Sequence, residues 1–150
     1  MQSGAGKKTV SESSDATGKR LKVLVMDDQD MLRNLVGKML KAMRYEAGSA
    51  SSGEEALRVC REALEAGKPF DAVILDLTVP GGMDGIETLA GLRKLDPRVK
   101  AIVSSGYPEN IKRSSLDGCG VDAFLAKPYD VEKLAQVLRD VLEKDNDKPL

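Results

Sequence analysis

The feature that most constrains the fold is a short apolar run in the middle of the chain that ends in a carboxylate. Residues 72–75 read Ala-Val-Ile-Leu, and Asp76 follows at once. A continuous apolar run of this length is typical of a strand buried on both faces, as strands of parallel sheets are. Pro80, Gly81 and Gly82 then favour a loop. The sequence therefore predicts a central strand with Asp76 at its carboxyl end.

Apolar runs alternate with amphipathic segments along the chain. We expect strands at residues 21–26, 45–49, 72–75, 99–103 and 121–126, and helices at about 31–43, 53–66, 86–95, 108–116 and 131–142. Strict alternation of this kind predicts an α/β fold in which a parallel sheet is covered by helices on both faces. The common strand order for such a five-stranded unit is 2-1-3-4-5, and ligands bind at the carboxyl ends of its strands near the point where the order reverses.

The composition excludes several classes of protein. With 150 residues the chain suits one domain, and Lys+Arg 23 against Asp+Glu 24 leaves no basic surplus for nucleic acid. No apolar run approaches the roughly 18 residues of a membrane span, and the N-terminus lacks the apolar region of a signal peptide. Cys60 and Cys119 are too few for a disulfide framework and fit a reducing compartment. We therefore expect a cytoplasmic protein with no direct nucleic-acid or membrane partner.

The domain boundaries follow from local composition. Residues 1–19 are rich in Ser, Gly, Thr and Lys and resemble a flexible tail or interdomain linker. The folded domain is expected over residues 20–144, and residues 145–150 form a polar, frayed end.

Polar residues end four of the expected strands. They are Asp27-Asp28, Asp76, Ser104-Ser105 and Lys127. Singly, each has a structural explanation, as a helix cap, a turn hydroxyl or a solvated charge. Together they would meet at one edge of the sheet, where clustered carboxylates repel unless a hard cation such as Mg²⁺ joins them. A carboxylate can attack phosphorus, and a Lys ammonium can neutralise phosphoryl oxygens, so the set is typical of phosphoryl chemistry.

Four motifs then carry a resemblance to a known family. They are VLVMDDQD at residues 23–30, VILDLTVPGGMDG at 73–85, AIVSSGY at 101–107 and AFLAKPY at 123–129. Over about residues 20–142 the chain resembles the receiver domain of two-component response regulators, which implies a flavodoxin-like three-layer sandwich with five helices. The double glycine and the SSGY motif are most similar to those of receivers fused to hybrid sensor histidine kinases. Residues 1–19 would then be the interdomain linker of such a protein.

The resemblance implies a role for each acidic residue. Asp76 matches the phosphoacceptor and is also a ligand of the metal. Asp27 and Asp28 match the acidic pair that holds Mg²⁺, with Asp28 as the preferred direct ligand. The backbone carbonyl of Thr78 would complete the protein's share of the metal shell.

The resemblance also implies the parts that respond to phosphorylation. Ser105 matches the switch hydroxyl, with Ser104 as its register-shifted rival. Lys127 matches the lysine that pairs with a phosphoryl oxygen, and Lys127-Pro128 is expected to be a cis peptide. Phe124 occupies the position of an aromatic rotamer switch, although a plain core aromatic would explain it equally well.

The implied function is a signalling switch and not an enzyme, with at most weak autophosphatase activity. The chain contains no histidine, so a phosphohistidine donor must lie on a partner histidine kinase or histidine phosphotransfer domain. Phosphorylation would change the face built from residues 108–116, 121–126 and 131–142, which is also a candidate surface for a homodimer. The sequence leaves open the cognate kinase, the stimulus, the output, the oligomeric state and the lifetime of the phosphorylated state.

Two alternatives stay open at this point. A phosphatase of the haloacid dehalogenase type also uses Mg²⁺ and a nucleophilic Asp, and residues 28–30 form a DxD sequence; however, Leu32 stands where that motif usually has Thr. A flavin-binding module on the same fold needs a hydroxyl-rich phosphate loop after the first strand, where Asp27 and Asp28 would repel the phosphate.

Overall fold

The computed structural model describes residues 20–77, 85–106 and 120–147. The strands are β1 (Lys22–Met26), β2 (Glu46–Ala50), β3 (Ala72–Asp76), β4 (Lys100–Ser105) and β5 (Ala123–Ala126), and the helices are α2 (Asp30–Ala42), α3 (Gly53–Glu65), α4 (Gly85–Leu95) and α6 (Val131–Asp147). The described part of the chain therefore contains four helices, and the helix expected at residues 108–116 lies outside it. None of the helices in these ranges is long and apolar enough to cross a membrane.

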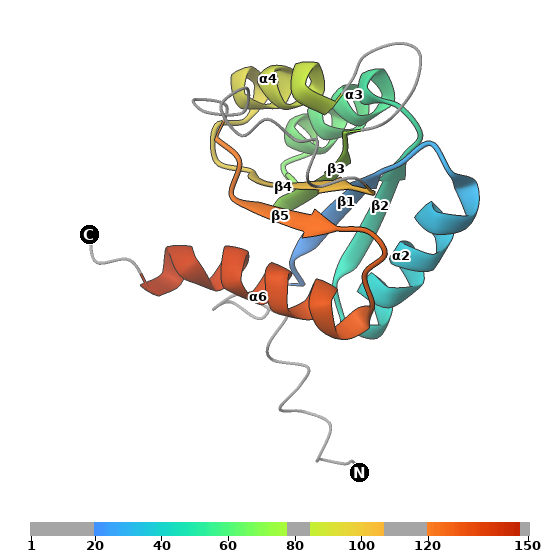
Figure 1. Ribbon diagram of the computed structural model, residues 1–150. Helices are drawn as coiled ribbons and strands as arrows, with labels where there is room; N and C mark the ends of the chain where they lie inside the picture. The colour runs from blue at the N-terminus through green and yellow to red at the C-terminus, as the bar shows by residue number, and fades with distance from the viewer. Residues whose placement is uncertain (1–19, 78–84, 107–119, 148–150) are drawn as a thin grey trace.

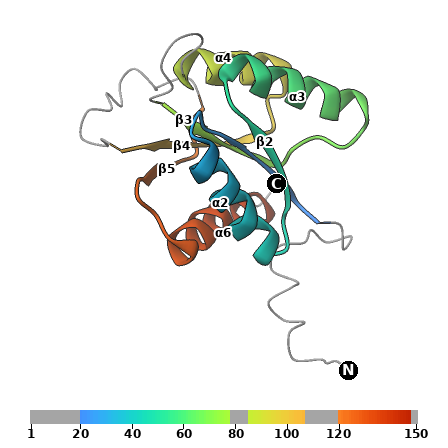
Figure 2. The same ribbon diagram turned by 90° about the vertical axis from the view of Figure 1, so that its right-hand side faces the viewer.

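All strand pairs are parallel, and the order is β2-β1-β3-β4-β5. Helices α2 and α6 cover one face of the sheet, and α3 and α4 cover the other (Figures 1 and 2). The predicted three-layer architecture and strand order are therefore confirmed. The central position of β3 explains its apolar sequence, because all five of its residues are buried.

The core is divided in two by the sheet. Successive strand residues point to opposite faces, so Ala72 and Ile74 pack toward α2 and α6 while Val73 and Leu75 pack toward α3 and α4. Leu40, Leu134 and Leu138 fill the first layer, and Ala56, Leu89 and Leu92 fill the second; all six are fully buried. Burial on both faces fixes the register of β3, because a slip of one residue would exchange the two sets.

Several element boundaries differ from the expected ones. β4 continues to Ser105, two residues past the expected range, because Ser104 pairs with Asp76 and Ser105 pairs with Ala126. β5 begins at Ala123 and not at residue 121. Asp130 caps the last helix, since the Lys133 N–H donates to Asp130 Oδ1 at 2.8 Å.

Candidate functional site

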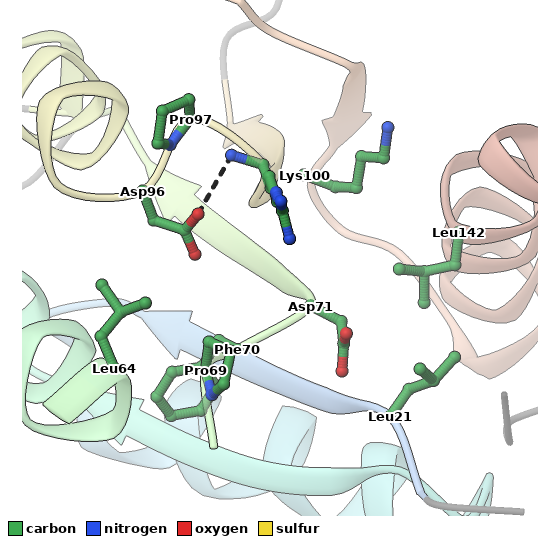
Figure 3. A pocket seen from close by; sticks show the side chains of 10 residues that line it. Leu21, Leu64, Pro69, Phe70, Asp71, Asp96, Pro97, Lys100 and Leu142 are labelled. Carbon is green, nitrogen blue, oxygen red and sulfur yellow. Dashed lines mark hydrogen bonds between the residues drawn. The ribbon is translucent and has the colours of Figure 1, made fainter. Parts of the chain in front are cut away.

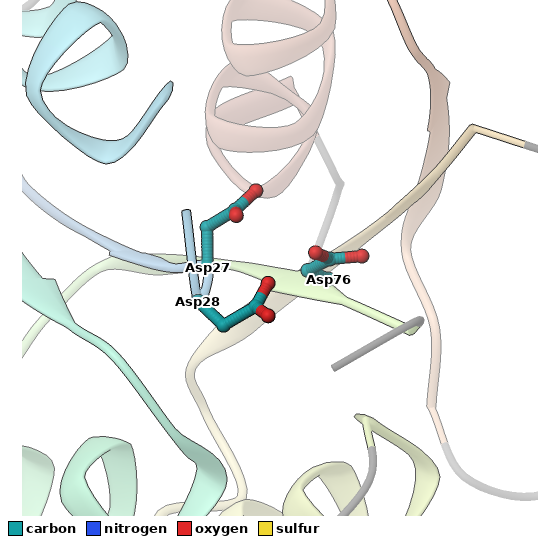
Figure 4. A group of neighbouring side chains, drawn as sticks. All are labelled: Asp27, Asp28 and Asp76. Carbon is teal, nitrogen blue, oxygen red and sulfur yellow. The ribbon is translucent and has the colours of Figure 1, made fainter. Parts of the chain in front are cut away.

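Three carboxylates gather at the carboxyl ends of β1 and β3. Each of Asp27, Asp28 and Asp76 offers one oxygen, and these oxygens lie within 4.8 Å of one another (Figure 4). The cause is the sheet topology: β1 and β3 are neighbours in register, with Met26 opposite Leu75, so the residues that follow meet at one edge. Asp27 and Asp76 are each only 2% exposed, whereas Asp28 is exposed to solvent.

Lys127 supplies the positive charge of this cluster. Its Nζ lies 2.9 Å from Asp27 Oδ2 and 3.1 Å from Asp76 Oδ2, and its side chain is 15% exposed. Burial disfavours the ammonium form, but the hydrogen bonds and negative charges of the two aspartates outweigh burial and raise the pKa of Lys127 above its ordinary value. Lys127 is therefore fully charged at neutral pH. The peptide bond to Pro128 is cis, as the resemblance implied.

The structural explanation of the acidic pair as helix caps is not supported. The N-cap of α2 is Gln29, and no side chain caps this helix. Asp27 Oδ1 accepts from the Gln29 N–H at 2.9 Å, while Asp27 Oδ2 accepts from Lys127. The carboxylate of Asp27 is thus held between the backbone of the β1–α2 loop and the lysine that follows β5.

The two serines lie in β4 beside this cluster, and both are buried, at 2% and 3% exposure for Ser104 and Ser105. The Ser104 carbonyl accepts from the Leu77 N–H at 3.0 Å, and the Ser105 carbonyl accepts from the Lys127 N–H at 2.9 Å. Strand register places Ser104 opposite Asp76 and Ser105 one residue nearer the edge. Both serines therefore stay candidates for the switch hydroxyl.

The other candidates are placed as follows. Phe124 is half-buried in β5 and pairs with Val103. Thr78, Tyr107 and the glycine pair at residues 81–82 lie outside the described residues.

Two residues near the cluster were not singled out from the sequence. Arg33 of α2 donates from Nη1 to the Asp27 carbonyl at 2.7 Å. Tyr129 packs among the residues of the α2 and α6 layer, and its burial, together with the charges of Asp27 and Asp76, raises the pKa of its hydroxyl. A single cation on a helix and a single tyrosine after a strand carry no sequence signal that separates them from ordinary surface or core residues.

The charge of the cluster fits a divalent cation. Among the residues of this cluster that the structure describes, three carboxylates face one ammonium, so negative groups are in excess. Carboxylate oxygens are the ligands that Mg²⁺ prefers, and the exposed Asp28 leaves the group accessible from solvent. Asp27, Asp28 and Asp76 are thus the described residues that could hold such an ion.

A cavity of about 620 Å³ lies at the opposite, amino-terminal edge of the sheet (Figure 3). Its lining mixes apolar side chains with Asp71, Asp96, Arg98 and Lys100, and it includes none of the clustered carboxylates. The acids are balanced by bases within the same wall, so the cavity does not select an ion of either sign. The chemistry therefore points to the carboxyl edge and not to this cavity.

With this geometry in place, comparison with known proteins is decisive. Residues 23–139 match the family model of the response regulator receiver domain. The chain belongs to this family. Receiver domains of two-component systems are signalling switches and not enzymes in the usual sense, bind Mg²⁺ at an acidic pocket, and interact with histidine kinases or phosphotransfer proteins.

Individual relatives show how much of each protein the receiver domain covers. This chain is 34% identical over 142 residues to sensor kinase CckA of Brucella abortus. The matched region spans 95% of this chain but 14% of that protein. The chain is 32% identical over 125 residues to chemotaxis protein CheY of Thermotoga maritima, spanning 83% of this chain and 98% of that protein. Among solved structures, the CheX–CheY–BeF₃–Mg²⁺ complex from Borrelia burgdorferi superposes with a TM-score of 0.76 at 26% identity, covering 86% of this chain and 95% of that chain.

Replacing the lysine tests how this receiver domain holds its buried carboxylates together. In Lys127→Met, Asp27 and Asp76 keep their charges but lose the ammonium that bonds both, so without metal ions we expect the free energy of unfolding to fall by about 2–4 kcal/mol. Urea unfolding in EDTA at neutral pH measures this, with Lys133→Met on the exposed face of α6 as control. Equal unfolding free energies for Lys127→Met and wild type would contradict the assignment.

Neutralising the exposed carboxylate of Asp28 should raise the stability of the metal-free protein, the opposite of the effect expected for Lys127→Met. In Asp28→Asn, weaker repulsion within the cluster should stabilise the metal-free receiver domain by on the order of 1 kcal/mol, or roughly 2–4 °C in melting temperature. Millimolar Mg²⁺ should raise the melting temperature of the wild type and barely change that of Asp28→Asn. Thermal unfolding with Mg²⁺ or EDTA checks both effects, with Asp140→Asn as control. An undiminished Mg²⁺ effect in Asp28→Asn would exclude Asp28 as a ligand.

Proposed function

We propose that this receiver domain is the phosphoacceptor switch of a two-component phosphorelay, with Asp76 as the residue that becomes phosphorylated. The observation that supports this most strongly is the bond between Lys127 and Asp76 at 3.1 Å, inside a group of three carboxylates. Asp76 is the only member of that group that ends the central strand, and it is buried beside the lysine. It therefore combines a fixed position with a neighbouring cation.

The transfer is a simple exchange at phosphorus. An oxygen of Asp76 forms a bond to phosphorus while the bond from phosphorus to the imidazole nitrogen of the donor breaks. The electron pair of that bond returns to the imidazole, and the product is an acyl phosphate. The donor is a phosphohistidine on a histidine kinase or a histidine phosphotransfer domain, because this chain has no histidine of its own.

The receiver's own residues prepare the site for this exchange. Asp27, Asp28, Asp76 and the carbonyl of Thr78 would hold Mg²⁺, which would supply positive charge for the phosphoryl oxygens. Lys127 keeps its ammonium beside the acceptor through its second bond to Asp27, at 2.9 Å, and pairs with a phosphoryl oxygen after transfer. Burial of Asp27 and Asp76 keeps these charges in a medium that screens them weakly.

The response to phosphorylation runs along β4 and β5. The Ser105 hydroxyl turns to bond the phosphoryl group, and Phe124, in the neighbouring strand, moves into the space that it leaves. The two strands are in register, with Ser105 opposite Ala126 and Phe124 opposite Val103, so both side chains belong to one paired segment. This rebalances two populations of the face that includes β5 and α6, to which the helix expected at residues 108–116, outside the described residues, would belong; this face is a candidate surface for a homodimer.

The relatives suggest a larger context. The matched part of sensor kinase CckA is only 14% of that protein, so the relative is much longer than a receiver domain. This supports the proposal that the receiver described here belongs to a hybrid sensor histidine kinase. In that arrangement residues 1–19 are the interdomain linker, residues 20–144 the receiver, and residues 145–150 a C-terminal tail that begins within the last turn of α6, which ends at Asp147. The protein then acts in the cytoplasm without contacting nucleic acid directly, and its autophosphatase activity is at most weak.

The assignment of the acceptor is tested with acetyl phosphate as a small-molecule donor. In the presence of Mg²⁺, wild type and the control Asp140→Asn should become labelled, whereas Asp76→Asn should lose labelling, because its amide cannot form the acyl phosphate. Intact-mass spectrometry and mapping of the labelled peptide give the result. Labelling of Asp28 in place of Asp76 would contradict the switch and favour the phosphatase of the haloacid dehalogenase type.

The switch hydroxyl is tested by a matched pair of serine variants. Ser105→Ala should still be phosphorylated but lose a charge-assisted hydrogen bond, which shifts the switched population roughly tenfold or more toward the unswitched state. Ser104→Ala should switch as wild type does. The NMR signals of the Phe124 ring report the population before and after phosphorylation. A loss of switching in Ser104→Ala alone would assign the role to Ser104.

A further inference from the structure

Arg33 is a mostly buried cation that lies next to the acidic cluster without binding its carboxylates. Its side chain is 17% exposed, and its Nη1 donates to the backbone carbonyl of Asp27 at 2.7 Å. Its Nη2 donates to Oδ1 of Asp30, at the start of α2. The guanidinium thus uses its two Nη nitrogens on the two ends of the short loop that contains Asp28.

The backbone of Arg33 adds a third tie to the same loop. Its N–H donates to the Gln29 carbonyl at 2.9 Å. Asp27 in turn has each of its oxygens in a bond: the carbonyl with Arg33, Oδ1 with the Gln29 N–H at 2.9 Å, and Oδ2 with Lys127. Removing the guanidinium would release the hydrogen bond by which α2 holds the Asp27 carbonyl.

We propose that Arg33 is a positioning residue for the acidic pair. It holds the backbone of residues 27–30 so that Asp27 and Asp28 present their carboxylates to a divalent cation together. Its charge is paired with Asp30 and directed at a carbonyl, so it takes no oxygen away from the metal. This inference rests on the proposed function only in taking the carboxylate cluster as a Mg²⁺ site.

A positioning role and a purely electrostatic role predict opposite results. By charge alone, a guanidinium near a metal site repels the metal, so removing it would strengthen Mg²⁺ binding. If Arg33 orients the ligands, removing it weakens binding, as loss of residues that orient metal ligands does. Lysine does not replace the guanidinium in this role, because a single ammonium cannot reproduce the planar fork that reaches both Asp27 and Asp30.

The test compares Arg33→Met and Arg33→Lys with the wild type in the full chain. Lys38→Met is the control, because Lys38 is an exposed cation on the same helix. Mg²⁺ affinity is measured by isothermal titration calorimetry. We expect both Arg33 variants to bind Mg²⁺ about tenfold more weakly and Lys38→Met to bind as wild type. Equal or tighter binding by Arg33→Met, with normal binding by wild type, would overturn this inference alone; absent binding by wild type would overturn the proposed function as well.

A second measurement needs no metal. Amide hydrogen exchange in EDTA reports the Gln29 N–H, which is bonded to Asp27 Oδ1. In Arg33→Lys, the variant closer in size, this amide should exchange faster than in wild type, while the amide of Ile74 in the central strand stays equally protected and shows that the fold is intact. Unchanged exchange at Gln29 would show that Arg33 does not hold the loop, and the inference would fail.

Discussion

The site depends on one interaction, the ammonium of Lys127 lying between the carboxylates of Asp27 and Asp76. Two buried carboxylates side by side cost several kcal/mol each unless a counter-charge and hydrogen bonds offset their desolvation. The sheet order supplies the arrangement: β1 and β3 are neighbours, and only β4 lies between β3 and β5. The long side chain of Lys127 therefore spans the end of β4 to reach both acids. A different strand order would leave the same residues without partners.

The ammonium of Lys127 neutralises only part of the negative charge of the carboxylate cluster. The remaining negative charge is what allows the site to attract a cation. A fully neutralised group would have no affinity for a cation, and a group with no lysine would destabilise the fold. The stability needed to tolerate the remaining repulsion comes from elsewhere, from the two apolar layers on either face of β3. The core and the site thus use different parts of the same strand. Ala72 to Leu75 pack into the core, and Asp76 at the end of the strand belongs to the site.

The sequence predicts most of this arrangement because apolar runs and strand-end residues are local signals. The central strand, the parallel sheet and the convergence of Asp27, Asp28, Asp76 and Lys127 follow from them, although the strand order came from the common pattern of such folds. The end of β4 was misplaced because serine is compatible with both a strand and a turn, and only pairing with β3 and β5 decides. The role of Arg33 was missed because its partner within the site is the Asp27 carbonyl, a backbone group that leaves no trace in side-chain patterns.

Lys127 also connects the carboxylate cluster to the strand that carries the candidate switch serine. Its side chain contacts Asp27 and Asp76, and its backbone N–H donates to the Ser105 carbonyl at 2.9 Å. Under the proposed function, a new charge on Asp76 changes the balance of forces on the ammonium, and the same residue is fixed to β4 through its main chain. Lys127 is therefore a direct physical connection between the acceptor and β4, beside the response of the Ser105 hydroxyl and Phe124.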